Sequence, residues 1–124
     1  MKIIRKIAAP FVAAGFLAAS FVAAPATASA DANCPYLYLC VWEGFNYNGA
    51  KLQFIRCGWE NIGAMGWSDR IRSFKNNQSP GATTVFNNWN AATGRWEVLD
   101  RSRAPEFIPV VNFPIRTTDG IHVC

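Results

Sequence analysis

Residues able to support covalent catalysis are few in this chain of 124 residues. The sequence places no nucleophile beside its one histidine, His122, whereas a nucleophilic triad needs a histidine base next to the attacking group. Paired carboxylates are the other candidate, because two acids can cleave a glycosidic bond. The available acids show no spacing that selects a pair: Glu43, Glu60, Asp69, Glu97 and Asp100. We therefore expect no catalytic residue, no cofactor and no enzymatic activity.

Four cysteines offer the clearest chemistry, the formation of disulfides. All of them follow residue 30: Cys34, Cys40, Cys57 and Cys124. An even number of cysteines in a short exported chain is typical of a disulfide framework. Of the three pairings, we favour Cys34–Cys40, which closes a short loop, and Cys57–Cys124, which would restrain the last residues. No metal site is expected, because the chain has no Cys-x-x-Cys pair and a single histidine.

The first 30 residues have the three parts of a secretory signal peptide. Basic residues come first, residues 7–24 are almost wholly apolar, and Ala28-Ser29-Ala30 matches a cleavage site of the A-x-A kind. A transmembrane anchor is the alternative. Pro10 and Pro25 bracket the stretch, and its many alanines make a poor membrane span. We predict a signal peptide over residues 1–30 and a secreted product.

The formal net charge of +4 belongs mostly to this predicted signal peptide. Residues 31–124 keep 9 basic and 8 acidic residues, a net charge of +1. A near-neutral domain gives no electrostatic reason to expect a nucleic acid or an anionic membrane as a partner. We expect residues 31–124 to form one monomeric domain that binds neither.

The elements that must position these residues are predicted to be β-strands. Short runs rich in β-branched and aromatic residues are expected as strands at residues 36–42, 51–55, 83–86, 95–99 and 121–123. Turn signals separate the runs, among them Asn48-Gly49, Thr93-Gly94 and Asp119-Gly120. Only residues 61–66 suggest a short helical turn. Turns at this spacing predict an all-β sandwich or barrel.

An internal repeat divides the domain into two halves. The pattern Val41-Trp42-x-x-Phe45-Asn46 recurs 44 residues later as Val85-Phe86-x-x-Trp89-Asn90. A glycine and a further predicted strand follow each copy. Farther on, Arg72-Ser73-Phe74 is echoed by Asp119-Gly120-Ile121. We predict two similar units packed face to face, since neither could bury its apolar face alone.

The first copy resembles the Greek-key signature of the βγ-crystallins. Trp42, Tyr47 and Gly49 match its aromatic, aromatic and glycine positions, and Ser73 matches the serine that closes the folded hairpin. The resemblance implies a positive φ at Gly49, an aromatic ring over the hairpin, and a Ser73 hydroxyl bonded to backbone groups that the hairpin leaves unpaired. The second copy departs from the pattern, because Ala91 replaces an aromatic and Gly94 comes one residue late.

The wider pattern is similar to the exported crystallin-like peptidase inhibitors of actinobacteria, the Streptomyces metalloproteinase inhibitor family. Further matching features are Cys34-x5-Cys40, Cys57-Gly58-Trp59, Ser68-Asp69-Arg70 and the segment 118–124. The resemblance implies a βγ-crystallin-like sandwich of two Greek-key motifs. It also implies tight inhibition of an extracellular metalloprotease by an exposed loop that binds as a substrate does, with preorganisation reducing the entropic cost.

The inhibitory loop of this family is cysteine-anchored and lies in the second half of the domain. Our sequence has no cysteine between Cys57 and Cys124, so no reactive-site residue is carried over. The nearest substitute is the proline-stiffened segment 101–114, with Arg103, Phe107 and Ile108 as candidate inhibitory residues. The alternative is that Phe107 and Ile108 are strand residues of the core.

Calcium must be considered because many crystallin-type domains bind it. Calcium needs several oxygen ligands. In the first copy Arg72 replaces the usual hydroxyl ligand, and in the second the leading acidic or amide pair is absent, so only Asp69 and Asp119 remain as plausible carboxylates. We predict no tight calcium site.

Two other classes of function remain open beside inhibition. Residues 31–124 carry 14 aromatic residues, and five of these are tryptophans. Large rings supply most of the buried area of a small β core, but some could lie on a binding surface. Together with the asparagine-rich stretches 76–77 and 87–90, they suggest a killer-toxin-like or antimicrobial domain that binds a cell-surface or wall polymer. The third class is a structural extracellular protein without a tight partner.

Overall fold

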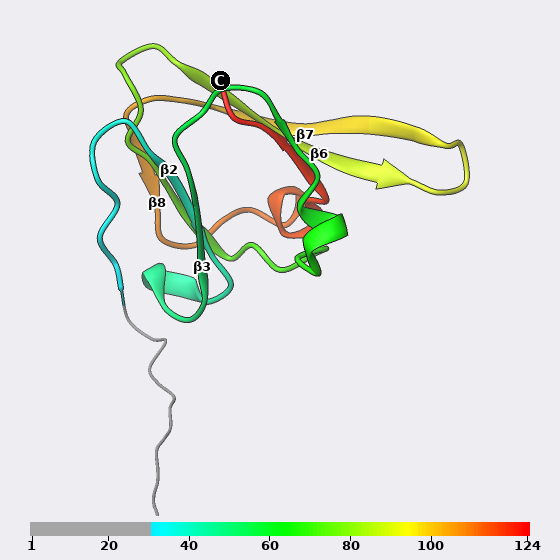
Figure 1. Cartoon of the computed structure of the whole chain (residues 1–124). Helices are drawn as coiled ribbons and strands as arrows, with labels where there is room; N and C mark the ends of the chain where they lie inside the picture. Colours follow the sequence, from blue (N-terminus) through cyan, green and yellow to red (C-terminus); the bar gives the residue numbers. More distant parts are fainter. Residues whose placement is uncertain (1–30) are drawn as a thin grey trace, which may run out of the picture.

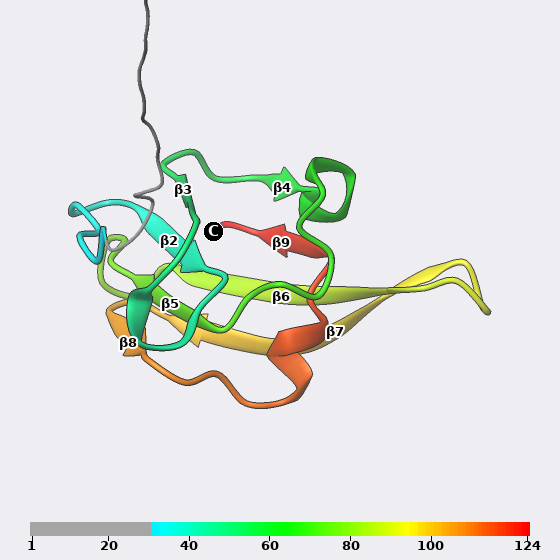
Figure 2. The same cartoon turned by 90° about the horizontal axis from the view of Figure 1, so that it is seen from below.

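The structure, a computed structural model, describes residues 31–124; the predicted signal peptide lies outside the described residues. Eight strands form two four-stranded antiparallel sheets (Figures 1 and 2). In spatial order the first sheet contains β3 (Lys51–Phe54), β2 (Leu39–Trp42), β5 (Ser73–Asn76) and β8 (Glu106–Ile108). The second contains β4 (Trp59–Glu60), β9 (Gly120–His122), β6 (Thr83–Asn90) and β7 (Arg95–Arg103). Within residues 31–124, no helix is both long and apolar enough to span a membrane.

Each sheet takes three strands from one half of the chain and its fourth strand from the other half. In the first half β2 pairs with both β3 and β5, whereas β4 crosses over to pair with β9. In the second half β6, β7 and β9 lie together, whereas β8 crosses over to pair with β5. The 44-residue repeat places Leu39 and Thr83 at the starts of β2 and β6. This arrangement confirms the predicted all-β, βγ-crystallin-like sandwich of two Greek-key motifs.

The core lies between the two sheets. Phe74 of β5 and Phe86 of β6 meet there with their ring centroids 5.0 Å apart, so the two sheets are in direct aromatic contact. A buried polar network adjoins this core. The Gln78 side-chain amide donates to Thr84 Oγ1 at 2.8 Å and to the Val123 carbonyl at 2.9 Å. Because buried polar groups are costly when unpaired, this network fixes how the chain passes between the sheets.

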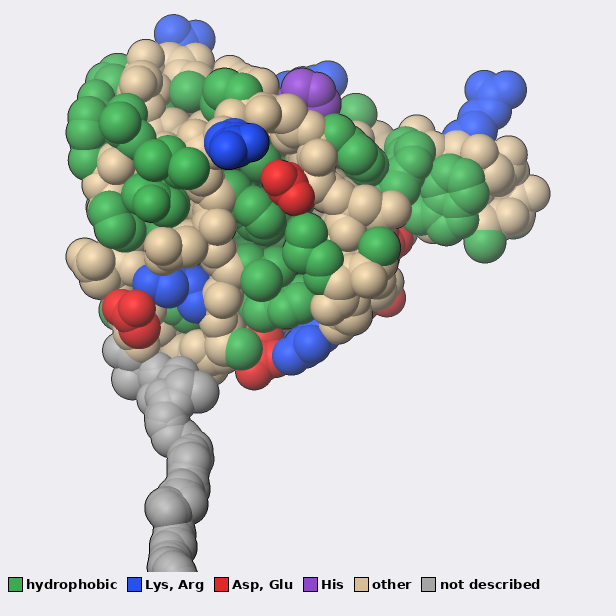
Figure 3. Space-filling view, in the orientation of Figure 1, with side chains coloured by type: hydrophobic (Ala, Val, Ile, Leu, Met, Phe, Trp, Pro, Cys, Tyr) green, Lys and Arg blue, Asp and Glu red, His purple; other side chains and the backbone are tan. Residues whose placement is uncertain are grey.

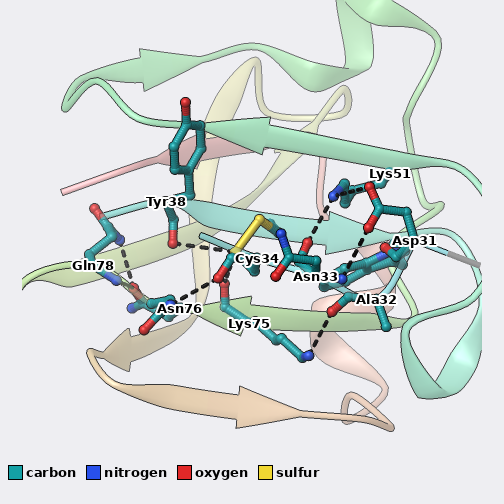
Figure 4. The surroundings of a disulfide bond; sticks show 12 residues. Asp31, Ala32, Asn33, Cys34, Tyr38, Lys51, Lys75, Asn76 and Gln78 are labelled. Atoms are coloured by element: carbon teal, nitrogen blue, oxygen red, sulfur yellow. Dashed lines mark hydrogen bonds and ion pairs between the residues drawn. A yellow bond between two sulfur atoms is a disulfide. The ribbon is translucent and has the colours of Figure 1, made fainter. Parts of the chain in front are cut away.

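Two disulfides join Cys34 to Cys40 and Cys57 to Cys124, the pairing favoured from the sequence. Figure 4 shows the surroundings of the first. There the Lys51 ammonium lies 2.8 Å from an Asp31 carboxylate oxygen, and the Lys75 ammonium donates to the Ala32 carbonyl at 2.7 Å. The segment before Cys34 is therefore held against β3 and β5.

Trp42 lies beneath this segment and not between the sheets. Its side chain is fully buried, it packs with the Cys34–Cys40 disulfide, and its indole N–H donates to the Asp31 carbonyl at 2.8 Å. The Tyr47 ring meets it edge-on, with centroids 5.2 Å apart. The first sheet thus has a small second core on its outer face.

The hairpin between β2 and β3 folds back on itself. It contains the 3-10 turn η3 (Phe45–Tyr47), in which Asn46 and Tyr47 have positive φ. Gly49 follows with a φ of +83°, as a folded hairpin requires. The Ser73 hydroxyl accepts from the Tyr47 N–H at 3.0 Å and donates to the Gly44 carbonyl at 2.7 Å. The buried Ser73 side chain therefore binds backbone groups at two positions of the folded hairpin, Gly44 and Tyr47.

The corresponding hairpin of the second motif does not fold back. β6 and β7 stay paired from Thr83–Arg103 to Asn90–Arg95, and the hairpin projects well beyond the body of the domain (Figures 1 and 2). Asn90 closes its tip, since its side-chain oxygen accepts from the Ala92 N–H at 3.0 Å. Both departures noted in the sequence, Ala91 and Gly94, lie in this tip.

Strand positions differ from the sequence predictions mainly at their ends. β2 begins at Leu39, after Leu37 adopts a φ of +83° that is incompatible with a strand. β6 and β7 are both longer than predicted, because they remain paired out to the projecting tip. Two strands were not predicted, β4 and β5, whereas β8 contains Phe107 and Ile108, the residues of the strand alternative. The short helical turn is η4 (Ile62–Met65), with the Asn61 side chain accepting from the Ala64 N–H at its start.

Candidate functional site

Two surfaces contain the residues that the sequence analysis selected. The first is the segment 101–109, which runs from the end of β7 into β8 along an edge strand of each sheet. Its side chains alternate between the interior and the solvent up to β8. Arg101, Arg103 and Pro105 are exposed, whereas Ser102 and Ala104 are buried. The segment therefore consists of two strand ends joined by a bend at Ala104–Pro105, and from Arg101 to Pro105 every second side chain faces solvent.

Hydrogen bonds hold the interior side of this segment. The Asn76 side-chain amide donates to the Ser102 carbonyl at 3.0 Å. The Ala104 N–H donates to the Ala82 carbonyl at 2.8 Å, and the Ala104 carbonyl accepts from the Gly81 N–H at 2.9 Å. After Pro105 the chain pairs with β5 as β8. The backbone is thus fixed on both sides of Pro105.

The three candidate inhibitory residues have different surroundings. Arg103 is exposed at the end of β7. Phe107 lies on β8 with 48% of its surface exposed, and the Lys75 ammonium sits 5.5 Å from its ring centroid. Ile108, the next residue, packs against the main core. The alternative that both are strand residues of the core thus holds for Ile108, whereas Phe107 is a strand residue that faces solvent.

The second surface is a group of three tryptophans, Trp59, Trp89 and Trp96, called here the tryptophan group. Trp89 and Trp96 are cross-strand partners on the projecting hairpin, with centroids 5.2 Å apart. Trp59, from β4, meets Trp96 edge-on at 4.6 Å. Figure 3 shows hydrophobic side chains gathered over the projecting hairpin. The sequence showed these residues only as separate aromatics, because their contacts join three strands.

Gly120 makes the contact between Trp59 and Trp96 possible. A Cβ atom at this position would overlap the Trp59 ring and would lie 2.8 Å from the Trp96 ring. Gly120 is the residue that echoes Ser73 in the repeat. The serine that folds the first hairpin is therefore replaced, in the second motif, by the residue that admits two indole rings.

A pocket of about 620 Å³ adjoins the tryptophan group. Two indoles, amides and carboxylates line it: Asn61, Gly63, Ser68, Asp69, Asn88, Trp89, Trp96 and Asp119. The structure thus brings together Asp69 and Asp119, the two carboxylates left by the calcium argument. Burial raises the pKa of the Asp69 carboxyl and the nearby Asp119 carboxylate raises it further, whereas Arg72 acts in the opposite direction.

Protein groups occupy the oxygens of Asp119. One oxygen accepts from the Ser68 hydroxyl, and the other accepts from the backbone N–H of Trp89 at 2.9 Å. The Asn88 amide, oriented to satisfy its hydrogen bonds, also donates to Asp119 at 3.0 Å. Within residues 31–124 no three histidine, cysteine or acidic side chains form a group that could hold a metal ion. The absence of a tight calcium site remains a prediction.

His122 lies on β9 with an exposed side chain, opposite Trp59 and Val85 on the neighbouring strands. No serine, threonine or cysteine is its partner in either strand pairing. The strand register therefore gives no support to a nucleophilic site at this histidine.

Comparisons with known proteins give one family and a set of solved structures. The model of peptidase inhibitor family I36 matches residues 27–99. No curated protein matches the chain. The chain is similar to a βγ-crystallin domain from Clostridium beijerinckii, with 19% identity and a TM-score of 0.47 over 68% of this chain and 93% of that chain. A single-substitution mutant of that domain gives 17% identity and a TM-score of 0.49, over 68% and 94%.

Proposed function

The chain belongs to peptidase inhibitor family I36, and we propose that it inhibits an extracellular metalloprotease by presenting the segment 101–109 to the enzyme's cleft. Family membership supports a protease as the partner and agrees with a protein that is not an enzyme. Three statements are proposals: that the target is a metalloprotease, that the protein acts outside the cell, and that the segment 101–109 makes the contact.

The observation that carries the proposal is that this segment, two strand ends joined by a bend, has its backbone fixed on both sides of Pro105. Peptides often bind as added strands, with main-chain hydrogen bonds giving affinity and alternate side chains entering pockets. Residues 101–105 have the same alternation, and β8 lies at the edge of its sheet. Because the segment is already ordered, binding costs little further conformational entropy.

The same anchoring explains how an inhibitor would resist turnover. If a protease cut the chain near Pro105, the upstream end would remain bonded through Ser102 and Ala104. The downstream end would remain paired with β5 through β8. The cut ends would stay close together, which favours resealing over release. Hydrogen bonds would here perform the task that a disulfide performs in a cysteine-anchored loop.

Phe107 is the side chain best suited to a specificity pocket. It is large and apolar, it is half exposed, and it lies on the edge strand. Arg103 would contact the rim of the cleft. Buried aromatic anchors commonly dominate the binding energy of an interface. Loss of the Phe107 ring should therefore weaken inhibition by about 2 kcal/mol, about 30-fold in the inhibition constant.

Titration of a thermolysin-like metalloprotease and a subtilisin-like serine protease with the purified protein tests the proposal. We expect stoichiometric inhibition of the metalloprotease, weakened by Phe107→Ala and, to a lesser degree, by Arg103→Ala. Val98→Ala is the matched control, since Val98 is also an exposed apolar residue but lies nearer the other end of β7. Full protease activity at every ratio, or equal effects of Phe107→Ala and Val98→Ala, would contradict it.

The alternative function, binding to a cell-surface or wall polymer, is favoured by a different surface. The tryptophan group exposes three indole rings next to a pocket lined by polar side chains. This surface does not include Arg103, Phe107 or Ile108, so the two functions do not exclude each other.

A further inference from the structure

The tryptophan group places three partly exposed indole rings together on one surface of the domain. Trp59 and Trp89 are each 43% exposed and Trp96 is 37% exposed, although the three rings touch in series. Contiguous exposed apolar surface of this kind commonly marks a binding site. Gly120 lets Trp59 and Trp96 pack together over β9, and the extended β6–β7 hairpin places Trp89 beside Trp96.

The adjoining pocket supplies polar groups that are free to bind a ligand. The Asn61 side-chain oxygen accepts from the Ala64 N–H, but its amide N–H groups donate to no other residue in the described part of the chain. The Asp69 carboxylate likewise accepts no hydrogen bond from residues 31–124. One residue with unused amide donors and one with an unused carboxylate therefore line the same pocket as two indole rings.

This combination has the chemistry of a sugar site. A pyranose ring has an apolar face of C–H groups, which packs on an aromatic ring, and a rim of hydroxyls, which both donate and accept hydrogen bonds. Ligand pockets in general combine aromatic walls with a few well-placed polar groups. A volume of about 620 Å³ lies within the range of small-molecule sites.

The charge of the pocket restricts the kind of sugar. Asp69 and Asp119 line the pocket and no lysine or arginine does. Two carboxylates would repel uronic acids and phosphorylated or sulfated sugars, since like charges at close range cost free energy. They would accept hydrogen bonds from neutral hydroxyls and from the N–H of an acetamido group.

We propose that the tryptophan group and its pocket bind neutral or N-acetylated sugar units of a polysaccharide. Trp89 and Trp96 provide the stacking platform, Asn61 and Asp69 bind hydroxyl or acetamido groups, and Trp59 supports Trp96. This inference rests on the alternative function given above, binding to a cell-surface or wall polymer, names its ligand class, and does not depend on protease inhibition. Trp96 and Arg103 are seven positions apart on β7, about 23 Å at the usual rise per residue. The polysaccharide and the protease would therefore contact different parts of the strand.

Titration of the purified protein with two soluble oligosaccharides, N-acetylglucosamine hexamer and cellohexaose, tests the proposal by calorimetry and tryptophan fluorescence. At least one of them should bind, with a change in fluorescence because the indoles become covered. Trp96→Ala and Trp89→Ala should each raise the dissociation constant at least 10-fold. Tyr36→Ala is the matched aromatic control, because Tyr36 is 61% exposed and lies outside the pocket. It should leave binding unchanged.

Two further measurements make each outcome decisive. Trp89→Ala leaves the Trp59–Trp96 contact in place, so it still tests the site if Trp96→Ala fails to fold. Polygalacturonate, a polymer of uronic acid, should not bind. Absence of binding to both neutral hexamers, preferential binding to polygalacturonate, or binding that the two tryptophan variants leave unchanged would overturn the proposal. Phe107→Ala should keep full sugar affinity, which separates this outcome from that of the inhibition test.

Discussion

The Ser73 hydroxyl accepts a hydrogen bond from the backbone N–H of Tyr47 at 3.0 Å, linking β5 to a turn 26 residues earlier. Tyr47 has a φ of 61°, which is unfavourable for a residue with a side chain. Ser73 is fully buried and also donates to Gly44. Replacing it leaves two partly buried backbone groups, the Tyr47 N–H and the Gly44 carbonyl, without their protein partner. We expect Ser73→Ala to lower the free energy of unfolding by about 2 kcal/mol, measured by urea denaturation.

Ser79→Ala is the control for this prediction. Ser79 is exposed, and its hydroxyl makes no hydrogen bond to another residue of the described chain. Its replacement should leave the urea midpoint unchanged. Equal midpoints for both variants would show that the Ser73 hydroxyl does not stabilise the hairpin.

The two disulfides should contribute unequally to stability. Cys57 and Cys124 are 67 residues apart, whereas Cys34 and Cys40 are 6 apart. In the chain-entropy model the longer loop contributes about 4 kcal/mol and the shorter about 2 kcal/mol. The double variant Cys57→Ala, Cys124→Ala should therefore unfold at lower urea than Cys34→Ala, Cys40→Ala. The reverse order would mean that the packing of the short loop on Trp42 outweighs loop entropy.

Asp69 should make the stability of the domain depend on pH. Its pKa is raised in the folded protein above the ordinary value of 3.8, so the folded state binds this proton more tightly. Its contribution is therefore most favourable below pH 3.8 and is lost as the pH rises through the raised pKa. Asp69→Asn should raise the melting temperature at pH 7 and have little effect at pH 3. Asparagine also tolerates the φ of 60° at this position.

Glu106→Gln provides the comparison for this experiment, because it removes one negative charge from β8, outside the pocket that holds Asp119. The difference in melting temperature between Asp69→Asn and the parent protein should grow as the pH rises from 3 to 7. The difference between Glu106→Gln and the parent protein should not show this pH dependence. A constant difference for Asp69→Asn from pH 3 to pH 7 would exclude the burial of the Asp69 carboxylate, and its repulsion by Asp119, as the cause.

Gly120→Ala adds only one methyl group, but it should disturb the tryptophan group. The added methyl group would overlap the Trp59 and Trp96 rings, which must move to admit it. We expect a loss of about 1–3 kcal/mol of stability and a changed near-ultraviolet circular dichroism. In a Trp59→Ala background the same substitution should cost less, because one of the two rings is gone. Additive effects of the two substitutions would contradict the contact.

The first motif was largely predictable because its information is local. Gly49, Tyr47 and Ser73 are spaced as the folded hairpin requires, and the backbone follows that spacing. The helical turn at residues 62–65 was also marked in the sequence, by Asn61 at its start and Gly66 at its end. Such signals act between residues that are close in the chain or joined by one hydrogen bond.

The missed features depend on contacts between distant segments. β4 has only two residues, Trp59 and Glu60, and becomes a strand through its pairing with β9. The sequence indicated a strand at Phe107 and Ile108 but not its partner, because the pairing of β8 with β5 joins the two halves of the domain. The tryptophan group needs three strands and a glycine to assemble. Neither hydrophobic period nor turn chemistry contains this information.

The exchange of β4 and β8 between the sheets also sets the order in which the chain can fold. β4 finds its strand partner only in Gly120–His122, and Cys57 finds its sulfur partner only in Cys124. The second sheet therefore stays incomplete until residues 120–124 have paired, so the first half of the domain cannot complete its native pairing alone. Folding should be late and all-or-none, and slow for a domain of this size, because its decisive contacts span more than half of the described chain.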